Sequence, residues 1–278
     1  MAAILTLLTD FGLADGYAGA LEGAIARVAP RVRVVTISHG VPAHDIGAGA
    51  YWLSASAPAF PEGTVHCVVV DPGVGTGRPL VAARVDHQLV VAPDNGLLHF
   101  LWSRGQDRMA VRIDTGGFDQ ERISSTFHGR DLIGPLAARL AAGTVRIEDL
   151  GPRVPSPQLV SEFLPQGDSD GTTARVLVVD GFGNVILAVA RTPWYSPLAA
   201  SVSLSDGRVI SGLVRTYGEI EDDFALLWNS ADHLEIAGKG VSAAAALKLR
   251  PGDRVRVAWA GGIAPAAGGK ADRRSFAS

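Results

Sequence analysis

Residues 68–78 read Val68-Val69-Val70-Asp71-Pro72-Gly73-Val74-Gly75-Thr76-Gly77-Arg78, an apolar run that breaks into glycines. The three valines predict a buried strand, because β-branched residues without polar alternation suit a sheet that is covered on both faces. Asp71 follows at the carboxyl end of that strand, the edge where open α/β sheets bind ligands. The glycines allow tight bends and a close approach of the backbone to a ligand. The stretch therefore predicts a loop that holds something small, with Asp71 and Arg78 as its charged groups.

The glycines after the strand also invite a dinucleotide-binding interpretation. That fingerprint needs a helix to open at the glycines, so that its amides meet the pyrophosphate. Residues 78–85 instead have the apolar pattern of another strand. We therefore reject dinucleotide binding. A plain hairpin with a salt bridge between Asp71 and Arg78 stays open as the alternative for the loop in isolation.

Composition limits the class of protein. The chain has 278 residues, of which 47% are hydrophobic, enough for a large core and for one long or two ordinary domains. The net charge of -3 argues against a nucleic-acid surface, and no apolar segment approaches the length of a membrane span. The single cysteine, Cys67, fits a cytoplasmic protein without internal disulfides. Because Cys67 continues the valine strand, we expect a buried thiol and not a nucleophile.

The pattern divides the chain into two domains. Strands and helices alternate over residues 1–152, which predicts an N-terminal α/β domain with a mostly parallel sheet. Prolines, serines and acidic residues mark a linker at 153–171, and short strands separated by turn residues predict an all-β barrel domain at 172–263. Residues 264–278 are predicted to form a flexible tail.

Two aspartates near the motifs described next are predicted to begin helices. Asp94 lies near the cap of a short helix that starts within residues 94–98, and Asp131 is a plausible N-cap for an alanine-rich helix at 132–143. Gly143 is the expected end of that helix.

Five ordered motifs run through the chain: Thr9-Asp10-Phe11-Gly12, the loop at 71–78, Pro93-Asp94-Asn95-Gly96, Phe127-His128-Gly129-Arg130-Asp131, and Asp180-Gly181-Phe182-Gly183-Asn184. Together they closely resemble the S-adenosyl-L-methionine hydroxide adenosyltransferase family, relatives of the fluorinase and the chlorinase. The resemblance implies an α/β domain, a β-barrel domain and a homotrimer with active sites between neighbouring subunits. It also implies that S-adenosyl-L-methionine is the substrate and that no cofactor takes part.

The resemblance implies a catalytic trio, which falls on Asp71, Arg78 and His128. The halogenating relatives have tyrosine at the position of Asp71, and the fluorinase has serine at the position of Gly129 and an inserted loop that is absent between residues 84 and 98. All three differences favour hydroxide over halide as the nucleophile.

The chemistry accounts for these three residue types without the family. Water has a pKa of about 15.7, so attack on carbon needs a positive charge to stabilise developing hydroxide and a base to accept the proton. Arg78 supplies the charge, and His128 and Asp71 can share or relay the proton.

The resemblance also implies a set of substrate-binding residues. A carboxylate at Asp10 is expected to hold the ribose hydroxyls, since it can accept two hydrogen bonds. Asn184 is expected to read adenine, Tyr217 to stack on it, and Asp180 to meet the amino group of methionine. The other expected substrate contacts are Asp71, Phe182, Ser230, Glu235 and the backbone at Gly238. Ala231 stands where the fluorinase has an arginine that holds the methionine carboxylate. Which residue binds that carboxylate in this protein therefore stays open.

No metal site is expected, because the seven histidines show no His-x-x-x-His spacing and the single cysteine has no partner. The leading hypothesis is hydrolysis of S-adenosyl-L-methionine to adenosine and methionine. Two alternatives stay open: a halogenase that makes 5′-halo-5′-deoxyadenosine, and a non-catalytic sensor of adenosine or S-adenosyl-L-methionine. The sensor would keep Asp10 and Asn184 but has no need of the trio.

Overall fold

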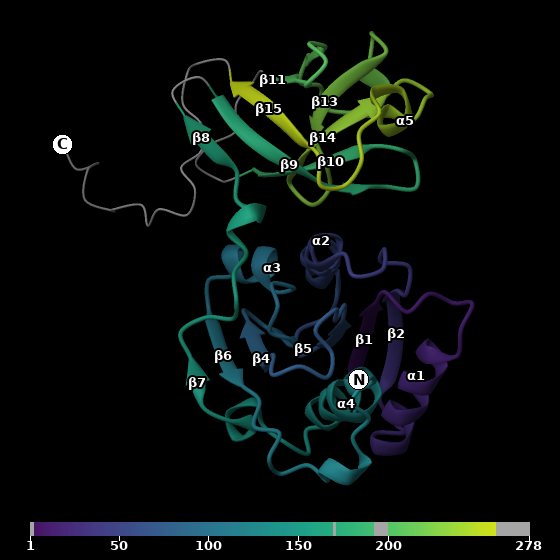
Figure 1. Cartoon of the computed structure of the whole chain (residues 1–278), viewed down its shortest axis with the longest axis vertical. Helices are drawn as coiled ribbons and strands as arrows, with labels where there is room; N and C mark the ends of the chain where they lie inside the picture. The colour runs from purple at the N-terminus through teal and green to yellow at the C-terminus, as the bar shows by residue number, and fades with distance from the viewer. Residues whose placement is uncertain (1–2, 169–170, 192–199, 260–278) are drawn as a thin grey trace, which may run out of the picture. The chain divides into compact units, whose positions relative to one another are not determined.

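The computed structural model describes residues 3–168, 171–191 and 200–259 (Figure 1). The chain divides into two compact units, Met1–Val160 and Ser161–Ser278, so the division falls within the predicted linker. The predicted tail at 264–278 and the end of the predicted barrel domain at 260–263 lie outside the described residues. Within the described ranges, no helix has the length and apolar character needed to cross a membrane.

The first unit is built on a mixed sheet with the strand order β2-β1-β3-β5-β4-β6-β7. Its parallel part consists of β2 (Arg33–Ser38), β1 (Ile4–Thr9), β3 (Val65–Val69) and β5 (Gln88–Pro93). The antiparallel part consists of β4 (Leu80–Val85), β6 (Arg108–Arg112) and β7 (Arg153–Val154). Every residue of β3 is buried, as the run of valines predicts.

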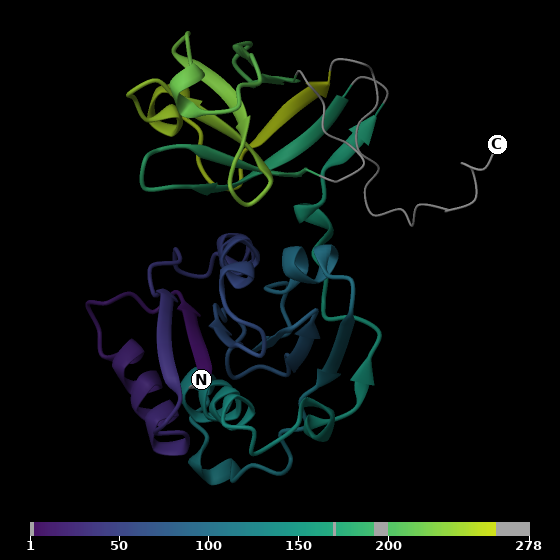
Figure 2. The ribbon, with the colours of Figure 1, turned by 180° about the vertical axis from the view of Figure 1, so that it is seen from behind.

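Helices cover both faces of this sheet. On one face α1 (Tyr17–Val28) and α4 (Gly134–Ala141) share a core with alternate residues of the central strands, among them Cys67 and Val69. The view from behind also shows these two helices side by side (Figure 2). On the other face α2 (Ile46–Ser56) approaches so closely that a Cβ on Gly49 would lie 3.1 Å from Val70. The helix α3 (His99–Arg104) packs beside α2.

The second unit is an antiparallel sheet with the order β12-β11-β15-β9-β10-β14-β13, with β8 paired to β9. Its strands are β8 (Gln166–Asp168), β9 (Gly171–Val179), β10 (Val185–Ala190), β11 (Ala200–Ser203), β12 (Val209–Ser211), β13 (Phe224–Trp228), β14 (His233–Gly238) and β15 (Arg254–Trp259), and one helix, α5 (Ala243–Leu247), follows β14. Directly after β12, Leu213 bridges to Leu226 of β13. This contact brings the two ends of the sheet together into a near-barrel.

The predicted fold class is therefore confirmed: an N-terminal α/β domain and a C-terminal all-β barrel. Two predicted helix starts are wrong. The helix α3 begins at His99, not within 94–98, and Asp94 is not its cap. A π-helical turn over Gly129–Ile133 precedes α4, so Asp131 lies inside a helical turn and cannot be an N-cap. Gly143, at φ +69, ends α4 as predicted.

Candidate active site

The site in the first unit lies at the carboxyl edge of the parallel strands. The strands β1 and β3 are neighbours in parallel register, so the residues that follow them emerge at the same edge. Asp10 follows β1, and Asp71 follows β3 after one further buried residue. Asp10 Oδ2 accepts a hydrogen bond of 2.9 Å from the backbone nitrogen of His44, which fixes the side chain at this edge.

The loop from Asp71 to Arg78 is a compact turn that crosses the sheet edge. Val74 N donates to Asp71 O at 3.2 Å, and the Thr76 hydroxyl donates to Gly73 O at 2.6 Å. The loop does not form a hairpin, because β5 lies between β3 and β4 in the sheet. No helix opens at its glycines, in agreement with the rejection of dinucleotide binding.

The loop brings the predicted trio into direct contact. Arg78 Nε donates to Asp71 Oδ1 at 2.7 Å, and Arg78 Nη2 donates to Asp71 Oδ2. The same Nη2 lies 3.0 Å from His128 Nδ1. Only 11% of the Arg78 side chain and 5% of the Asp71 side chain are exposed, so the pair interacts away from bulk water. A bidentate pair of this kind has a fixed geometry.

The position of the Arg78 proton donors determines the protonation state and tautomer of His128. A guanidinium can only donate, so Nδ1 of His128 accepts, and the ring is neutral with its proton on Nε2. Burial, and then the charge of Arg78, lower the pKa of His128 from its usual 6.5, while Asp71 and Asp131 act in the opposite direction. The lowered pKa favours the neutral imidazole, in agreement with Nδ1 as the acceptor of the Arg78 hydrogen bond.

Hydrogen bonds to residues close by in the sequence hold the π-helical turn after His128. Asp131 Oδ2 accepts from the backbone nitrogen of Ser124 at 2.8 Å, and Arg130 Nε donates to Asp131 Oδ1 at 2.6 Å. Asp131 therefore positions the segment that carries His128 and does not cap α4. Hydrogen bonding to Arg130 and Ser124 lowers the pKa of Asp131 against the opposing effect of burial.

Three aromatic rings, Phe11, Tyr17 and Phe127, form a cluster at the residue before His128. The ring centroid of Phe127 lies 5.5 Å from that of Phe11 and 5.4 Å from that of Tyr17. A Cβ on Gly129 would lie 3.2 Å from both Phe11 Cζ and Val69 Cγ1, so glycine lets this wall close on the helical turn. The predicted site residues did not include these rings, although Phe11 and Phe127 belong to the motifs that carry the resemblance. The preference of ligand pockets for aromatic lining residues could have drawn attention to them.

In the second unit, Asp180 and Asn184 form one tight pair. Asp180 Oδ1 accepts from the backbone nitrogens of Phe182 and Asn184, both at 2.9 Å. Asn184 Nδ2 donates to Asp180 Oδ2 at 3.0 Å. Asn184 is buried directly before β10, whereas Phe182 is 86% exposed. The loop thus presents an aromatic ring next to an ordered carboxylate and amide.

Tyr217 and Glu235 form the other polar pair of the second unit. The Tyr217 hydroxyl donates to Glu235 Oε1 at 2.9 Å. Glu235 is 2% exposed, and this burial raises its pKa, with a smaller contribution from Asp180; hydrogen bonds from Tyr217 and Asn229 oppose the shift. The predicted site residues omitted Asn229, which also holds the turn before β14 by accepting from Ala231 and His233 at 3.0 Å each.

The remaining predicted contacts lie near these two pairs in the sequence. Ser230 is exposed in the turn between β13 and β14, and Gly238 ends β14, the strand of Glu235. A Cβ on Gly238 would lie 2.4 Å from the backbone oxygen of Val241, so only glycine fits there.

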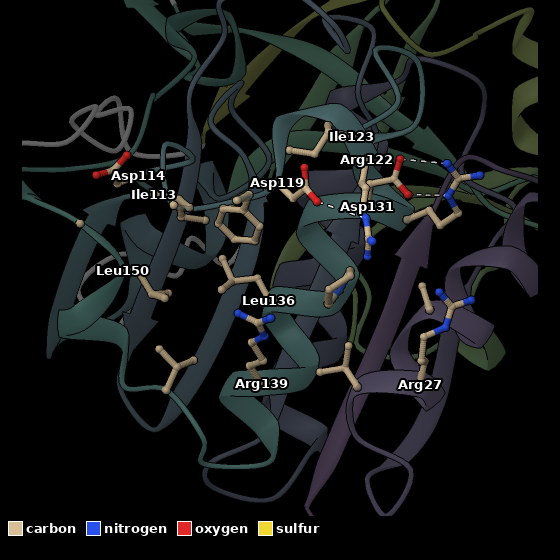
Figure 3. A pocket seen from close by; sticks show the side chains of 18 of the residues that line it. Arg27, Ile113, Asp114, Asp119, Arg122, Ile123, Asp131, Leu136, Arg139 and Leu150 are labelled. Atoms are coloured by element: carbon tan, nitrogen blue, oxygen red, sulfur yellow. Dashed lines mark hydrogen bonds and ion pairs between the residues drawn. The ribbon is translucent and has the colours of Figure 1, made fainter.

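The first unit also holds a separate cavity of about 1030 Å³ between α1, α4 and the loop at 113–123 (Figure 3). Figure 3 shows Arg122 directed down from the loop toward the cavity, while Arg139 rises from α4. Arg122 is paired with Asp119, and Arg27 and Arg139 lie in the last turns of α1 and α4, where a cation stabilises the helix end. These arginines are explained without a ligand. None of the trio lines this cavity.

The protein has two domains, and Asp71, Arg78 and His128 meet at one sheet edge of the α/β domain. Residues 5–151 match the family model described as the SAM hydroxide adenosyltransferase N-terminal domain, and residues 174–256 match that of the C-terminal domain. The chain belongs to the S-adenosyl-L-methionine hydroxide adenosyltransferase family, as its motifs indicate.

Individual relatives agree with this assignment. An (R)-S-adenosyl-L-methionine hydrolase from Salinispora tropica is 39% identical over 257 residues, which cover 91% of this chain and 97% of the relative. A fluorinase from Nocardia brasiliensis is 26% identical over 218 residues, which cover 68% of this chain and 72% of the relative. The crystal structure of an uncharacterized conserved protein from Thermotoga maritima superposes with a TM-score of 0.79 at 28% identity, over 91% of this chain and 99% of the other.

Proposed function

We propose that this protein hydrolyses S-adenosyl-L-methionine by attack of water on the 5′ carbon of the ribose, giving adenosine and L-methionine. The observation that carries the proposal is the contact of Arg78 with both Asp71 and His128 at the sheet edge. The 39% identity to a relative named as an S-adenosyl-L-methionine hydrolase, against 26% to a fluorinase, supports hydroxide over halide.

In this mechanism the trio handles the attacking water. As the oxygen–carbon bond forms, the bond from C5′ to the sulfonium sulfur breaks, and methionine leaves as a neutral thioether. The water proton passes to the Asp71 carboxylate or to Nδ1 of His128, the two acceptors that Arg78 now occupies. Arg78 keeps its charge throughout and stabilises the developing hydroxide. The reaction needs neither a metal nor a cofactor, because the positively charged sulfur is itself the leaving group.

The substrate contacts follow from the chemistry of each side chain. Asp10 accepts hydrogen bonds from the ribose hydroxyls, Asn184 pairs with adenine, and Tyr217 stacks on the base. Asp180 meets the methionine ammonium. Phe182, Ser230, Glu235 and the backbone at Gly238 complete the pocket.

The working form in this proposal is a homotrimer in the cytoplasm. Each site combines the trio of one subunit with barrel residues of a neighbour, so a monomer has only part of a pocket. The buried Cys67, whose pKa burial raises to about 12, suits a reducing compartment because the protein has no disulfide to keep.

Incubation of pure protein with S-adenosyl-L-methionine in water enriched in ¹⁸O tests the reaction. The expected result is methionine and adenosine, with the label at the 5′ hydroxyl. A parallel incubation in concentrated chloride tests for 5′-chloro-5′-deoxyadenosine. Tight binding of substrate without any product would favour a sensor and overturn the proposal, and so would a halogenated product formed faster than adenosine.

A further inference from the structure

The motif Pro93-Asp94-Asn95-Gly96 has no role in the reaction described above, although it is one of the five ordered motifs. It follows β5, the strand that lies between β3 and β4 in the sheet. The loop at 71–78 leaves β3 and enters β4, so it must pass over the end of β5. The motif therefore lies between the two ends of the loop that carries Asp71 and Arg78.

Hydrogen bonds join the motif to both ends of that loop. Asn95 Nδ2 donates to the backbone oxygen of Val70 at 2.9 Å, one residue before Asp71. The backbone nitrogen of Asp94 donates to the oxygen of Pro79 at 3.0 Å, one residue after Arg78. The loop is thus held immediately outside each of its two charged residues.

The other side of the motif is anchored as well. Asp94 Oδ1 accepts from the backbone nitrogen of Gln158 at 2.6 Å. Gly96, at φ +110, lies so close to the same segment that a Cβ would come within 2.3 Å of Val160 Cγ2. Contacts with residues 158–160 thus hold the motif on the side away from the loop.

The Asn95 amide uses only one of its two ends in a hydrogen bond within the described residues. Its Oδ1 is buried and, among the described residues, has no hydrogen-bond partner. An unsatisfied buried acceptor is destabilising, so an apolar residue of similar size would remove that cost. The donor bond to Val70 O is what an apolar residue cannot supply.

We infer that Asn95 is a positioning residue: it sets the backbone at Val70 so that the Asp71 carboxylate meets Arg78 and His128. This inference rests on the proposed role of Asp71. Small displacements at reacting groups cost large factors in rate, so loss of this bond is expected to affect turnover more than substrate affinity.

Asn95→Leu tests the inference, with Gln88→Met as the matched control. Gln88 begins β5 at the opposite end, where its side-chain amide donates to the backbone oxygens of Phe60 at 3.0 Å and Pro61 at 3.3 Å and its Oε1 lies 3.3 Å from His66 Nε2. Both variants replace an amide by an apolar side chain, and Gln88→Met loses at least as many hydrogen bonds as Asn95→Leu, so we expect its thermal midpoint to fall at least as far. We expect kcat to fall about tenfold in Asn95→Leu with KM within about twofold, and both to stay at the parent values in Gln88→Met.

A second readout does not depend on turnover. The charges that act on His128 are Arg78, Asp71 and Asp131. If Asp71 moves away, its raising effect weakens, so an NMR titration should give His128 a lower pKa in Asn95→Leu than in the parent and an unchanged pKa in Gln88→Met. A parental kcat and His128 titration in Asn95→Leu, or equal losses in Gln88→Met, would overturn the inference. Absence of hydrolysis in the parent would instead count against the proposed function, and the titration would still test Asn95.

Discussion

The two units place their polar side chains in different ways. In the first, the loop at 71–78 brings Asp71 and Arg78 into direct contact with each other and Arg78 into contact with His128 of a distant segment. In the second, the carboxylate of Glu235 projects from a strand and is buried with a raised pKa. The first arrangement sets an ion pair against a histidine, whereas the second buries one carboxylate beside a tyrosine hydroxyl and leaves the Phe182 ring exposed. Under the proposed function, the first unit supplies the chemistry and Asp10 for the ribose, and the second supplies the contacts to adenine.

Asp71→Ala should have the largest effect and should separate chemistry from substrate recognition most strongly. It removes a proton acceptor and one partner of Arg78, so we expect hydrolysis to fall by about 10² or more, the loss typical of a positioned proton-transfer group. Chromatography of products at saturating substrate measures the effect. Chlorinated product should remain a trace in concentrated chloride, because Gly129 has no side chain to bind halide. Chlorodeoxyadenosine formed at the parental rate of hydrolysis would show that Asp71 acts only as an electrostatic barrier.

Arg78→Lys should have the next largest effect. Lysine keeps the charge but cannot bond Asp71 through two nitrogens and reach His128 at the same time. We expect kcat to fall roughly tenfold to a hundredfold. This is less than the largest losses that follow complete removal of an oxyanion donor. Calorimetric titration with adenosine should give a nearly unchanged Kd. Equal losses in binding and rate would show that Arg78 grips the substrate and not the nucleophile.

Asn184→Ala should show the opposite division between binding and rate. The side chain is buried next to Asp180 and is expected to pair with adenine. Loss of its hydrogen bonds should raise KM about tenfold, equivalent to about 1.4 kcal/mol, with kcat within about twofold. Steady-state kinetics over a range of substrate concentrations measure both constants. A fall in kcat without a change in KM would contradict the assignment of recognition to the second unit.

The smallest expected effects concern stability, where the two units should respond to pH in opposite directions. The raised pKa of Glu235 means that its contribution is complete below about pH 4.5, the unfolded value, and is lost as pH rises through the folded pKa. Burial lowers the pKa of His66 to about 4, so its contribution is complete above pH 6.5 and is lost as pH falls toward about 4.

Scanning calorimetry of Glu235→Gln and His66→Gln at several pH values tests this opposition. Gln at 235 should remove part of the alkaline loss of stability, and Gln at 66 part of the acid loss. Parallel pH profiles for the parent and both variants would rule out these groups as the cause.

The sequence predicted most where local pattern and burial agree. The valines of β3, the alternation of strands with helices, and the glycine at the end of α4 all follow from short-range rules. The contact of Asp71, Arg78 and His128 was expected from the resemblance, since no spacing rule links residues 50 positions apart. The exchange of β4 and β5 in the sheet was not predictable, because pairing order depends on the whole sheet.

The errors near the site have a common physical origin. Asp94 and Asp131 both look like helix caps, because aspartate before an apolar run usually accepts from the first turn. In the folded chain their carboxylates accept instead from Gln158 and Ser124, backbone nitrogens brought there by tertiary packing. Tertiary contacts thus replaced the local capping preference of both aspartates. Both lie in segments that hold the trio in place.

The glycine at position 75 has a practical consequence for protein engineering. It has φ +76, and a Cβ there would lie 2.3 Å from the backbone oxygen of Ser125, three residues before His128. Any side chain introduced at 75 must push the histidine segment away from the loop. Mutant libraries aimed at new nucleophiles should therefore keep position 75 fixed and diversify the other residues of 71–78 together with 124–128, because the two segments are in contact at this glycine.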